Sequence, residues 1–250
     1  MTGQPAPGFS RLRVADIVLD DLLVPGHSTV GAAPRLRAVP RRRTRRIHLR
    51  AIQRQLHSAP SPRADTLIDV DFDESASVRG GNDVIGLRHE LVVVALEHLA
   101  RAKSDGRWFV RVRTFDEPSV YDMSVAPLDR RGLRGAQEIL LRESAGGSSV
   151  LHPSLRRAEE EAAIFAGARL QIVLSDFELY DADPTSALQA MIDSSATQVL
   201  GISLRNDPPP LLLTSRVRTA RVLSTDSAAD LANHVIDAAH ACVVTEGRNT

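Results

Sequence analysis

The chain has 250 residues, of which 43% are hydrophobic and only 4% aromatic, so it can form one ordinary domain whose core rests on aliphatic side chains. Its net charge is zero, and its single cysteine, Cys242, excludes an intrachain disulfide and a cysteine-based metal site. No apolar run is long enough to span a membrane and no apolar leader opens the chain, so we expect a cytoplasmic protein without membrane contact.

The first quarter of the chain is basic. Residues 22–64 contain ten arginines and no acid, so the remaining residues together carry the opposite charge (0 − 10 = −10). We predict an N-terminal arm over residues 1–62, partly disordered, and a folded domain over residues 63–245. The segment Arg45–Leu56 is compatible with a basic helix or with a solvated arm. Five arginines make up a possible basic patch: Arg41, Arg42, Arg43, Arg45 and Arg46.

From residue 65 onward, strand-like and helix-like segments alternate. The predicted strands are Thr66–Asp73, Trp108–Phe115, Arg169–Leu174, Gln198–Leu204 and Ala220–Leu223. Helices are expected over 82–102, around 136–142, and over 154–165, 185–194 and 228–241. In the second strand, Arg111 and Arg113 alternate with apolar residues, which predicts a less buried flank. The alternation predicts an α/β, Rossmann-like, doubly wound and mainly parallel open sheet, with helices on both faces.

Small oxygen-bearing side chains follow the predicted strands where the carboxyl ends of parallel strands meet. Asp73, Ser75 and Ser77 follow the first strand, Ser148 or Ser149 comes from a Gly-Gly-Ser-Ser loop, and Asp176 follows a later strand. Two carboxylates and three hydroxyls, completed by water, suit an octahedral Mg²⁺ or Mn²⁺ site. These loops hold no thiol or imidazole, which argues against zinc or copper.

Three motifs in this order resemble those of von Willebrand factor type A (VWA) domains. DESAS matches the family's DxSxS motif, GGSSVLHPSL is similar to its Gly-Gly-Thr loop and helix start, and LSDFE is similar to its strand-ending Thr/Ser-Asp-Gly motif. The resemblance covers about residues 65–241. It implies a metal-ion-dependent adhesion site made of Asp73, Ser75, Ser77, Ser149 and Asp176. Two departures are present, since Ser149 stands in place of threonine and Phe177 in place of glycine.

The resemblance also implies a function. In that family the metal takes an acidic side chain from a partner protein, so we expect a Mg²⁺-dependent protein-binding adaptor and not an enzyme. Intracellular bacterial proteins of this kind often act beside AAA+ ATPases of the MoxR type, which makes such an ATPase or its substrate an expected partner.

Three alternatives remain open at this point. Asp73 and the serines could simply cap a turn. The spacing of Asp69, Asp71 and Asp73 also resembles that of the paired acids in haloacid dehalogenase-like phosphatases, although Asp73 stands where that chemistry needs threonine or valine. Finally, the arginine-rich arm could bind an anionic surface or nucleic acid with the domain as a scaffold, although no aromatic residue lies between residues 22 and 64 to stack on bases.

Overall fold

The protein is built on one six-stranded sheet. The computed structural model describes residues 52–78, 83–102, 106–115, 121–140, 142 and 147–246. The strand order is β3-β2-β1-β4-β5-β6, and all neighbouring strands are parallel except β3, which lies antiparallel at the edge. The strands are β1 (Thr66–Asp73), β2 (Trp108–Phe115), β3 (Ala126–Pro127), β4 (Ala168–Ser175), β5 (Gln198–Leu204) and β6 (Arg218–Val222). This topology confirms the predicted doubly wound α/β fold.

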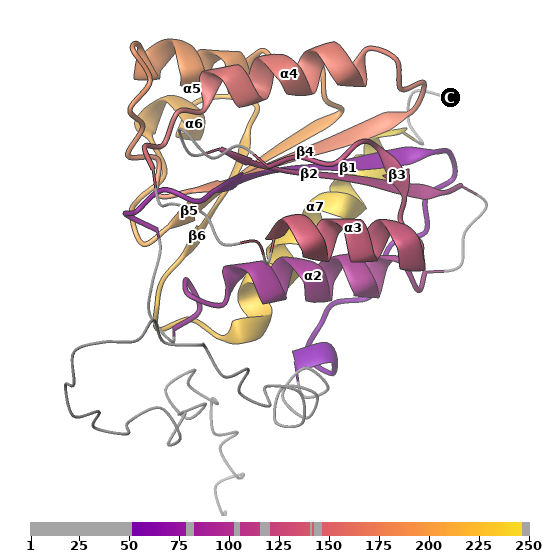
Figure 1. Ribbon diagram of the computed structural model, residues 1–250. Coiled ribbons are helices and arrows are strands. Elements are labelled where there is room, and N and C mark those ends of the chain that lie inside the picture. The colour runs from indigo at the N-terminus through magenta and orange to yellow at the C-terminus, as the bar shows by residue number, and fades with distance from the viewer. Residues whose placement is uncertain are drawn as a thin grey trace, which may run out of the picture.

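Helices cover both faces of the sheet (Figure 1). One layer holds α2 (Arg88–Leu99), α3 (Arg130–Leu140) and α7 (Ala228–Glu246), and the other holds α4 (His152–Ala162), α5 (Pro184–Ile192) and α6 (Pro210–Leu213). The helix α3 begins earlier than predicted, and neither the short α6 nor the two-residue β3 was predicted. Across the part of the chain that the structure describes, no helix has both the length and the apolar character to cross a membrane.

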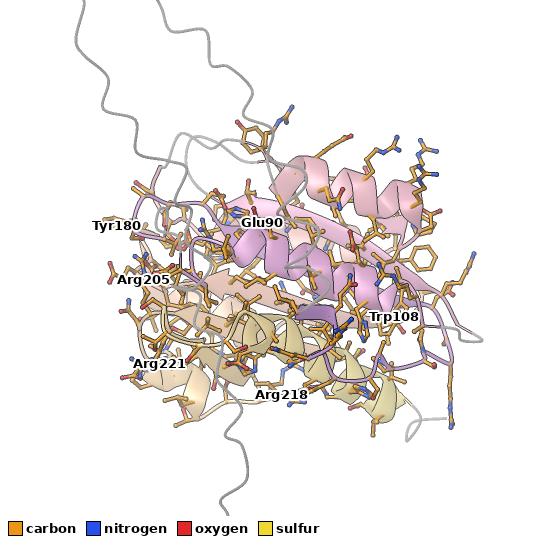
Figure 2. The ribbon with its side chains drawn as sticks, turned by 90° about the horizontal axis from the view of Figure 1, so that it is seen from below. Glu90, Trp108, Tyr180, Arg205, Arg218 and Arg221 are labelled. Atoms are coloured by element: carbon orange, nitrogen blue, oxygen red, sulfur yellow. The ribbon has the colours of Figure 1, made fainter. Side chains whose placement is uncertain are left out.

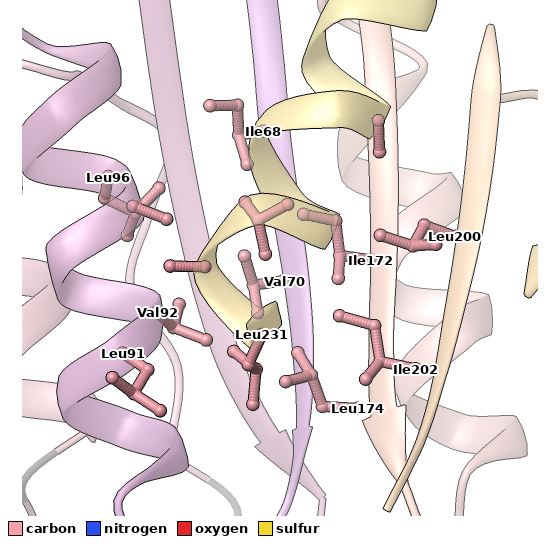
Figure 3. Packing of buried hydrophobic residues seen from close by; sticks show 14 of the residues in the cluster. Ile68, Val70, Leu91, Val92, Leu96, Ile172, Leu174, Leu200, Ile202 and Leu231 are labelled. Atoms are coloured by element: carbon pink, nitrogen blue, oxygen red, sulfur yellow. The ribbon is translucent and has the colours of Figure 1, made fainter. Parts of the chain in front are cut away.

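The layer of α2, α3 and α7 covers an apolar face of the sheet. Because side chains alternate along a strand, β1 turns Ile68, Val70 and Phe72 to this side, where they are fully buried. Figure 3 shows this packing, in which leucine, isoleucine and valine side chains of β4, β5, α2 and α7 meet those of β1. The larger of the two apolar clusters therefore lies between the sheet and α2 and α7.

A segment just before β1 packs on the outside of this layer. Ile52, Leu56 and Ala59 are partly buried against the same apolar cluster. His57 contacts Asp237 of α7 at 2.7 Å, between Nδ1 and Oδ1. Residues 52–59 thus contact the folded domain, while the domain boundary placed at residue 62 stays a prediction. The possible basic patch of residues 41–46, and the first part of the helix considered for residues 45–56, lie outside the described residues.

The opposite face of the sheet carries charged residues beneath α4. Asp69 and Asp71 of β1 and Arg111 and Arg113 of β2 are completely buried there. The prediction of a less buried flank at Arg111 and Arg113 is therefore wrong. These side chains alternate with apolar ones because they face buried acids and not because they face water.

The candidate metal site

The candidate site lies where β1 and β4 end. The chain builds the sheet outward from β1 to β2 and β3, and then returns to the other side of β1 with β4. The boundary between β1 and β4 is thus the point where the strand order reverses. Ligands of open α/β sheets bind at such a point, beyond the carboxyl ends of the strands. Asp73 is the last residue of β1, and Asp176 follows the last residue of β4.

Asp73 is the centre of a hydrogen-bonded group. Its Oδ1 accepts a hydrogen bond from the backbone N–H of Ser75 at 2.8 Å. Its Oδ2 accepts two more, from the hydroxyl of Ser149 at 2.7 Å and from the hydroxyl of Ser175 at 2.5 Å. Asp73, Ser149 and Ser175 are fully buried. Three segments that are distant in the sequence therefore meet at one carboxylate.

The other predicted residues lie around this group. The hydroxyl oxygens of Ser75 and Ser77 are 3.1 Å apart. The Asp176 carboxylate is almost buried, and its Oδ1 accepts the backbone N–H of Glu178 at 3.1 Å. No hydrogen bond within the described residues joins the Asp176 side chain to the other four. The structure thus brings Asp73 and Ser149 into contact, pairs Ser75 with Ser77, and leaves Asp176 beside them at the end of the neighbouring strand.

Ser149, and not Ser148, faces Asp73. Ser148 is exposed, whereas Ser149 is buried and bonded to the Asp73 carboxylate. The position of Ser149 is fixed from its other side by the loop after β4. In that loop, the backbone N–H of Tyr180 donates to the carbonyl of Ser149 at 2.7 Å.

Asp181 holds the start of α4, next to Ser149. Its two carboxylate oxygens accept the backbone N–H groups of Leu151 at 2.9 Å and of His152 at 2.8 Å. These N–H groups at a helix start have no partner within the helix, so an acid there satisfies them and also suits the helix dipole. Asp181 thereby ties the loop after β4 to the helix that follows Ser149.

The strand register explains why Asp73 differs from the other acids of β1. Asp69 lies opposite Arg111 and Asp71 lies opposite Arg113, whereas Asp73 lies opposite Phe115. Arg111 donates to both carboxylate oxygens of Asp69. Arg113 donates from Nη1 to Asp71 at 3.0 Å. Within the described residues, Asp73 has no cationic partner.

These two charge pairs are anchored to α4. The hydroxyl of Ser154 donates to Asp71 at 2.6 Å, and Arg113 donates to the carbonyl of Ser154, also at 2.6 Å. Burial alone would lower the pKa of Arg111, but its contacts with Asp69 and with Glu161 of α4 raise that pKa overall. Asp69 and Asp71 are therefore engaged in buried ion pairs with Arg111 and Arg113.

Asp73 is a buried carboxyl without a charged partner among the described residues. Burial raises the pKa of Asp73, although hydrogen bonds from Ser175, Ser75 and Ser149 act in the opposite direction. Burial of an ionised carboxylate is costly without a countercharge, and among the described residues the groups that donate to Asp73 are two hydroxyls and a backbone N–H, all neutral. The nearby side chains of Ser75, Ser149 and Asp176 end in hydroxyl and carboxylate oxygens, the type of ligand that Mg²⁺ and Mn²⁺ prefer.

Phe177 takes over the backbone role of the glycine that the resemblance led us to expect. Its φ is +58°, in the left-handed region that glycine adopts without cost. The backbone N–H of Phe177 donates to the hydroxyl of Ser175 at 2.8 Å, and its ring packs with the smaller apolar cluster between the sheet, α4 and α5. The loop thus keeps its turn, and the bulky ring is partly buried against the apolar cluster.

Sequence reasoning missed Ser175 as a member of the site. It lies on the strand next to β1 and on the same face as Asp73, one residue before the predicted ligand Asp176. Alternation from Asp176 points away from Ser175, since neighbouring residues of a strand face opposite sides; only the register of β4 beside β1 shows that Ser175 lies next to Asp73. In the described part of the chain, no three His, Cys, Asp or Glu side chains gather as a metal cluster, so the candidate site depends on serine hydroxyls as well as on its two acids.

No protein-family model and no curated protein matches the sequence. Solved structures do match. A von Willebrand factor type A protein from Catenulispora acidiphila superposes with a TM-score of 0.51 at 17% identity, over 70% of this chain and 42% of that chain. The pilus adhesin SpaC from Lactobacillus rhamnosus GG gives 0.54 at 11% identity, over 74% and 32%.

A third structure is the ArnB paralog VWA2 from Sulfolobus acidocaldarius. It superposes with a TM-score of 0.51 at 14% identity, over 72% of this chain and 47% of that chain. The chain therefore spans less than half the length of these three structures. At such low identity the likeness concerns the arrangement of helices and strands.

Proposed function

The chain has the von Willebrand factor type A fold, and from this premise we propose that it is a Mg²⁺-dependent protein-binding domain. Asp73, Ser75, Ser77, Ser149 and Asp176 would hold the ion, and Mn²⁺ would serve as well. The ion, when bound, offers a coordination position to a carboxylate of a partner protein. The fold supports an interaction or adhesion role, and the metal dependence is the further step that we propose.

The observation that carries this proposal is the buried Asp73 carboxylate without a cation. The two other acids on the same face of β1 each have an arginine at the matching position of β2, and Asp73 has Phe115 instead. A chain that neutralises two of three buried acids, and leaves the one at the ligand-binding edge, has a place for an external cation.

The protein side chains have separate tasks in this proposal. Asp73 and Asp176 supply charge, and Ser75, Ser77 and Ser149 supply neutral oxygens. Ser175 donates to Asp73 and orients its carboxylate, so it acts as a positioning residue. Two carboxylates balance the charge of a divalent ion, so a partner carboxylate would bind by completing the coordination shell of the ion, at a position otherwise held by water.

We propose binding and not catalysis, and the partner that the family resemblance suggests testing first is a MoxR-type AAA+ ATPase or its substrate. Purified candidates can be compared for association in Mg²⁺ and in EDTA. Association that persists unchanged in EDTA would contradict a metal-dependent contact.

The site itself is tested by thermal melts with and without Mn²⁺ or Mg²⁺. A ligand present at about 100 times its dissociation constant stabilises the folded state by about 2.7 kcal/mol. For a domain of this size that raises Tm by about 5–10 °C. We expect the rise in the wild type and its loss in Asp73→Ala, while Glu160→Gln, which removes an exposed acid of α4, should keep it. Equal Tm values with and without millimolar metal in the wild type would refute the metal site.

The alternative function through the arginine-rich arm makes the opposite prediction. Binding of an anionic surface or a nucleic acid through residues 41–46 should fall steeply as salt rises and should survive Asp73→Ala. Measuring the affinity for a DNA duplex against salt concentration, in the wild type and in Asp73→Ala, separates the two functions.

A further inference from the structure

An exposed arginine, Arg205, lies at the edge of the candidate metal site. Arg205 follows the last residue of β5, and its Nη1 donates to the backbone carbonyl of Ser77 at 2.9 Å. Figure 2 shows Arg205 at the same end of the molecule as Tyr180, whose N–H holds Ser149. Among the described residues, no carboxylate lies within ion-pair distance of Arg205, so its charge is available to a ligand.

The backbone holds Arg205 in a conformation that arginine disfavours. Its φ is +72°, where glycine would be the ordinary residue. The N–H of Arg205 donates to the carbonyl of Val222 at 2.8 Å, and the guanidinium of Arg221 donates to the carbonyl of Arg205 at 3.1 Å. Among described residues other than glycine, only Arg205 and Phe177 have positive φ, and both follow strands that end at this edge. Such strain gathers at sites where the side chain is used.

The two neighbouring arginines differ in their charge partners. Arg221 contacts Asp207 at 2.6 Å, so its charge is already compensated. Among the described residues, the side chain of Arg205 contacts a backbone carbonyl of the candidate site, through one of its nitrogens, and no carboxylate. A guanidinium with free donors beside a metal site is suited to a carboxylate, which it can bind through two parallel hydrogen bonds.

We propose that Arg205 binds a second carboxylate of the partner, beside the one that binds at the metal site. The partner segment is then an extended acidic peptide with at least two neighbouring Asp or Glu residues. This inference rests on the proposed function, since the first carboxylate is placed by the metal, and it adds the charge pattern of the segment that the domain selects.

The test compares Arg205→Gly with the wild type. Glycine adopts positive φ without steric cost, so this variant should fold with an equal or higher Tm and should retain its affinity for Mn²⁺. As a control, Arg218→Ala removes an exposed arginine from the start of β6, away from this edge (Figure 2). The probe is a fluorescently labelled decaglutamate peptide, measured by anisotropy in Mn²⁺, with decaglutamine for comparison.

We expect decaglutamate to bind the wild type and Arg218→Ala equally and to bind Arg205→Gly about five-fold more weakly, with the difference shrinking as salt rises. Equal affinity of the wild type and Arg205→Gly, or no binding of decaglutamate to the Mn²⁺-loaded wild type, overturns the role of Arg205. Electron paramagnetic resonance of Mn²⁺ reports the metal separately. Absence of metal binding in every variant overturns the proposed function and this inference together, whereas intact metal binding with equal peptide affinities overturns the inference alone.

Discussion

Replacing Arg113 with methionine should destabilise the domain strongly. Methionine keeps an unbranched chain of similar reach but removes the charge, so Asp71 is left buried without its cation. Breaking a buried ion pair by removing one partner costs about 3–5 kcal/mol. Here Asp71 retains hydrogen bonds from the Ser154 hydroxyl at 2.6 Å and from Gln171 Nε2 at 3.2 Å. Because these hydrogen bonds still stabilise the Asp71 carboxylate, we expect a cost at the lower end of that range, about 3 kcal/mol.

The loss can be measured by thermal and urea unfolding followed by circular dichroism. For a domain of this size, 3 kcal/mol corresponds to a fall in Tm of about 6–12 °C. The double variant Asp71→Asn, Arg113→Met removes the unpaired charge, so it should regain more than about 1 kcal/mol relative to Arg113→Met alone. A matched control is Arg221→Met, which breaks the exposed pair with Asp207 and should cost less than about 1 kcal/mol.

Two results would refute this reasoning. One is an Arg113→Met domain whose stability lies within about 1 kcal/mol of the wild type, like the exposed control. The other is a double variant whose loss of unfolding free energy equals or exceeds the sum of the losses measured for Asp71→Asn and Arg113→Met. Either would mean that Arg113 does not serve as the countercharge of Asp71.

Three further predictions concern other parts of the domain. Asp181→Ala should lower the unfolding free energy by about 1 kcal/mol, because it removes the acceptor of two backbone N–H groups at the start of α4. It should also weaken Mn²⁺ binding, because the start of α4 follows Ser149. An unchanged Mn²⁺ affinity would mean that Asp181 does not help to position the candidate site. Leu56→Ala should lower the unfolding free energy by about 1–2 kcal/mol, since Leu56 is partly buried on the main cluster, and an unchanged thermal melt would mean that this segment is not docked. Burial alone would raise the pKa of Glu159, but hydrogen bonds from Ser195, Arg169 and Ser194 lower it to about 2. The ionised Glu159 therefore stabilises the folded state fully above its ordinary pKa, and this contribution is lost as pH falls toward 2. With Glu159→Gln, the unfolding free energy should depend less on pH between about 4.5 and 2.

The alternation of strands and helices predicted the fold because each long strand of this sheet is covered on both faces. Four of the five predicted strands begin or end within a residue of their observed limits, and β6 begins two residues earlier than predicted. Neither β3 nor α6 was predicted, because two and four residues are too short to show a period. The helix α3 was predicted too short, since Arg130, Arg131 and Gly132 at its start carry no apolar pattern.

The buried charge pairs could not be predicted in the same way. Arg111 and Arg113 form an alternating pattern that is typical of a half-exposed strand. Whether they face solvent or acids depends on which strand lies beside β2 and in which register, and local sequence does not contain that information. The residues of the candidate site could be proposed from the sequence, because Asp73, Ser149 and Asp176 each stand at the end of a predicted strand or before a predicted helix. Its electrostatic character, an acid without a countercharge, became visible only with the register.

The register of β1 against β2 decides which acid of this face stays unpaired. If β1 slipped by two residues, Asp71 would face Arg111, Asp73 would face Arg113, and Asp69 would face Phe109. The unpaired carboxylate would then lie near the amino end of β1, away from the candidate site, and its burial without a cation would cost several kcal/mol. Apolar side chains tolerate such a slip more easily than charges do. The alternating acids and arginines therefore favour one alignment of the two strands during folding, in which the acid left without an arginine is Asp73, at the carboxyl end of β1.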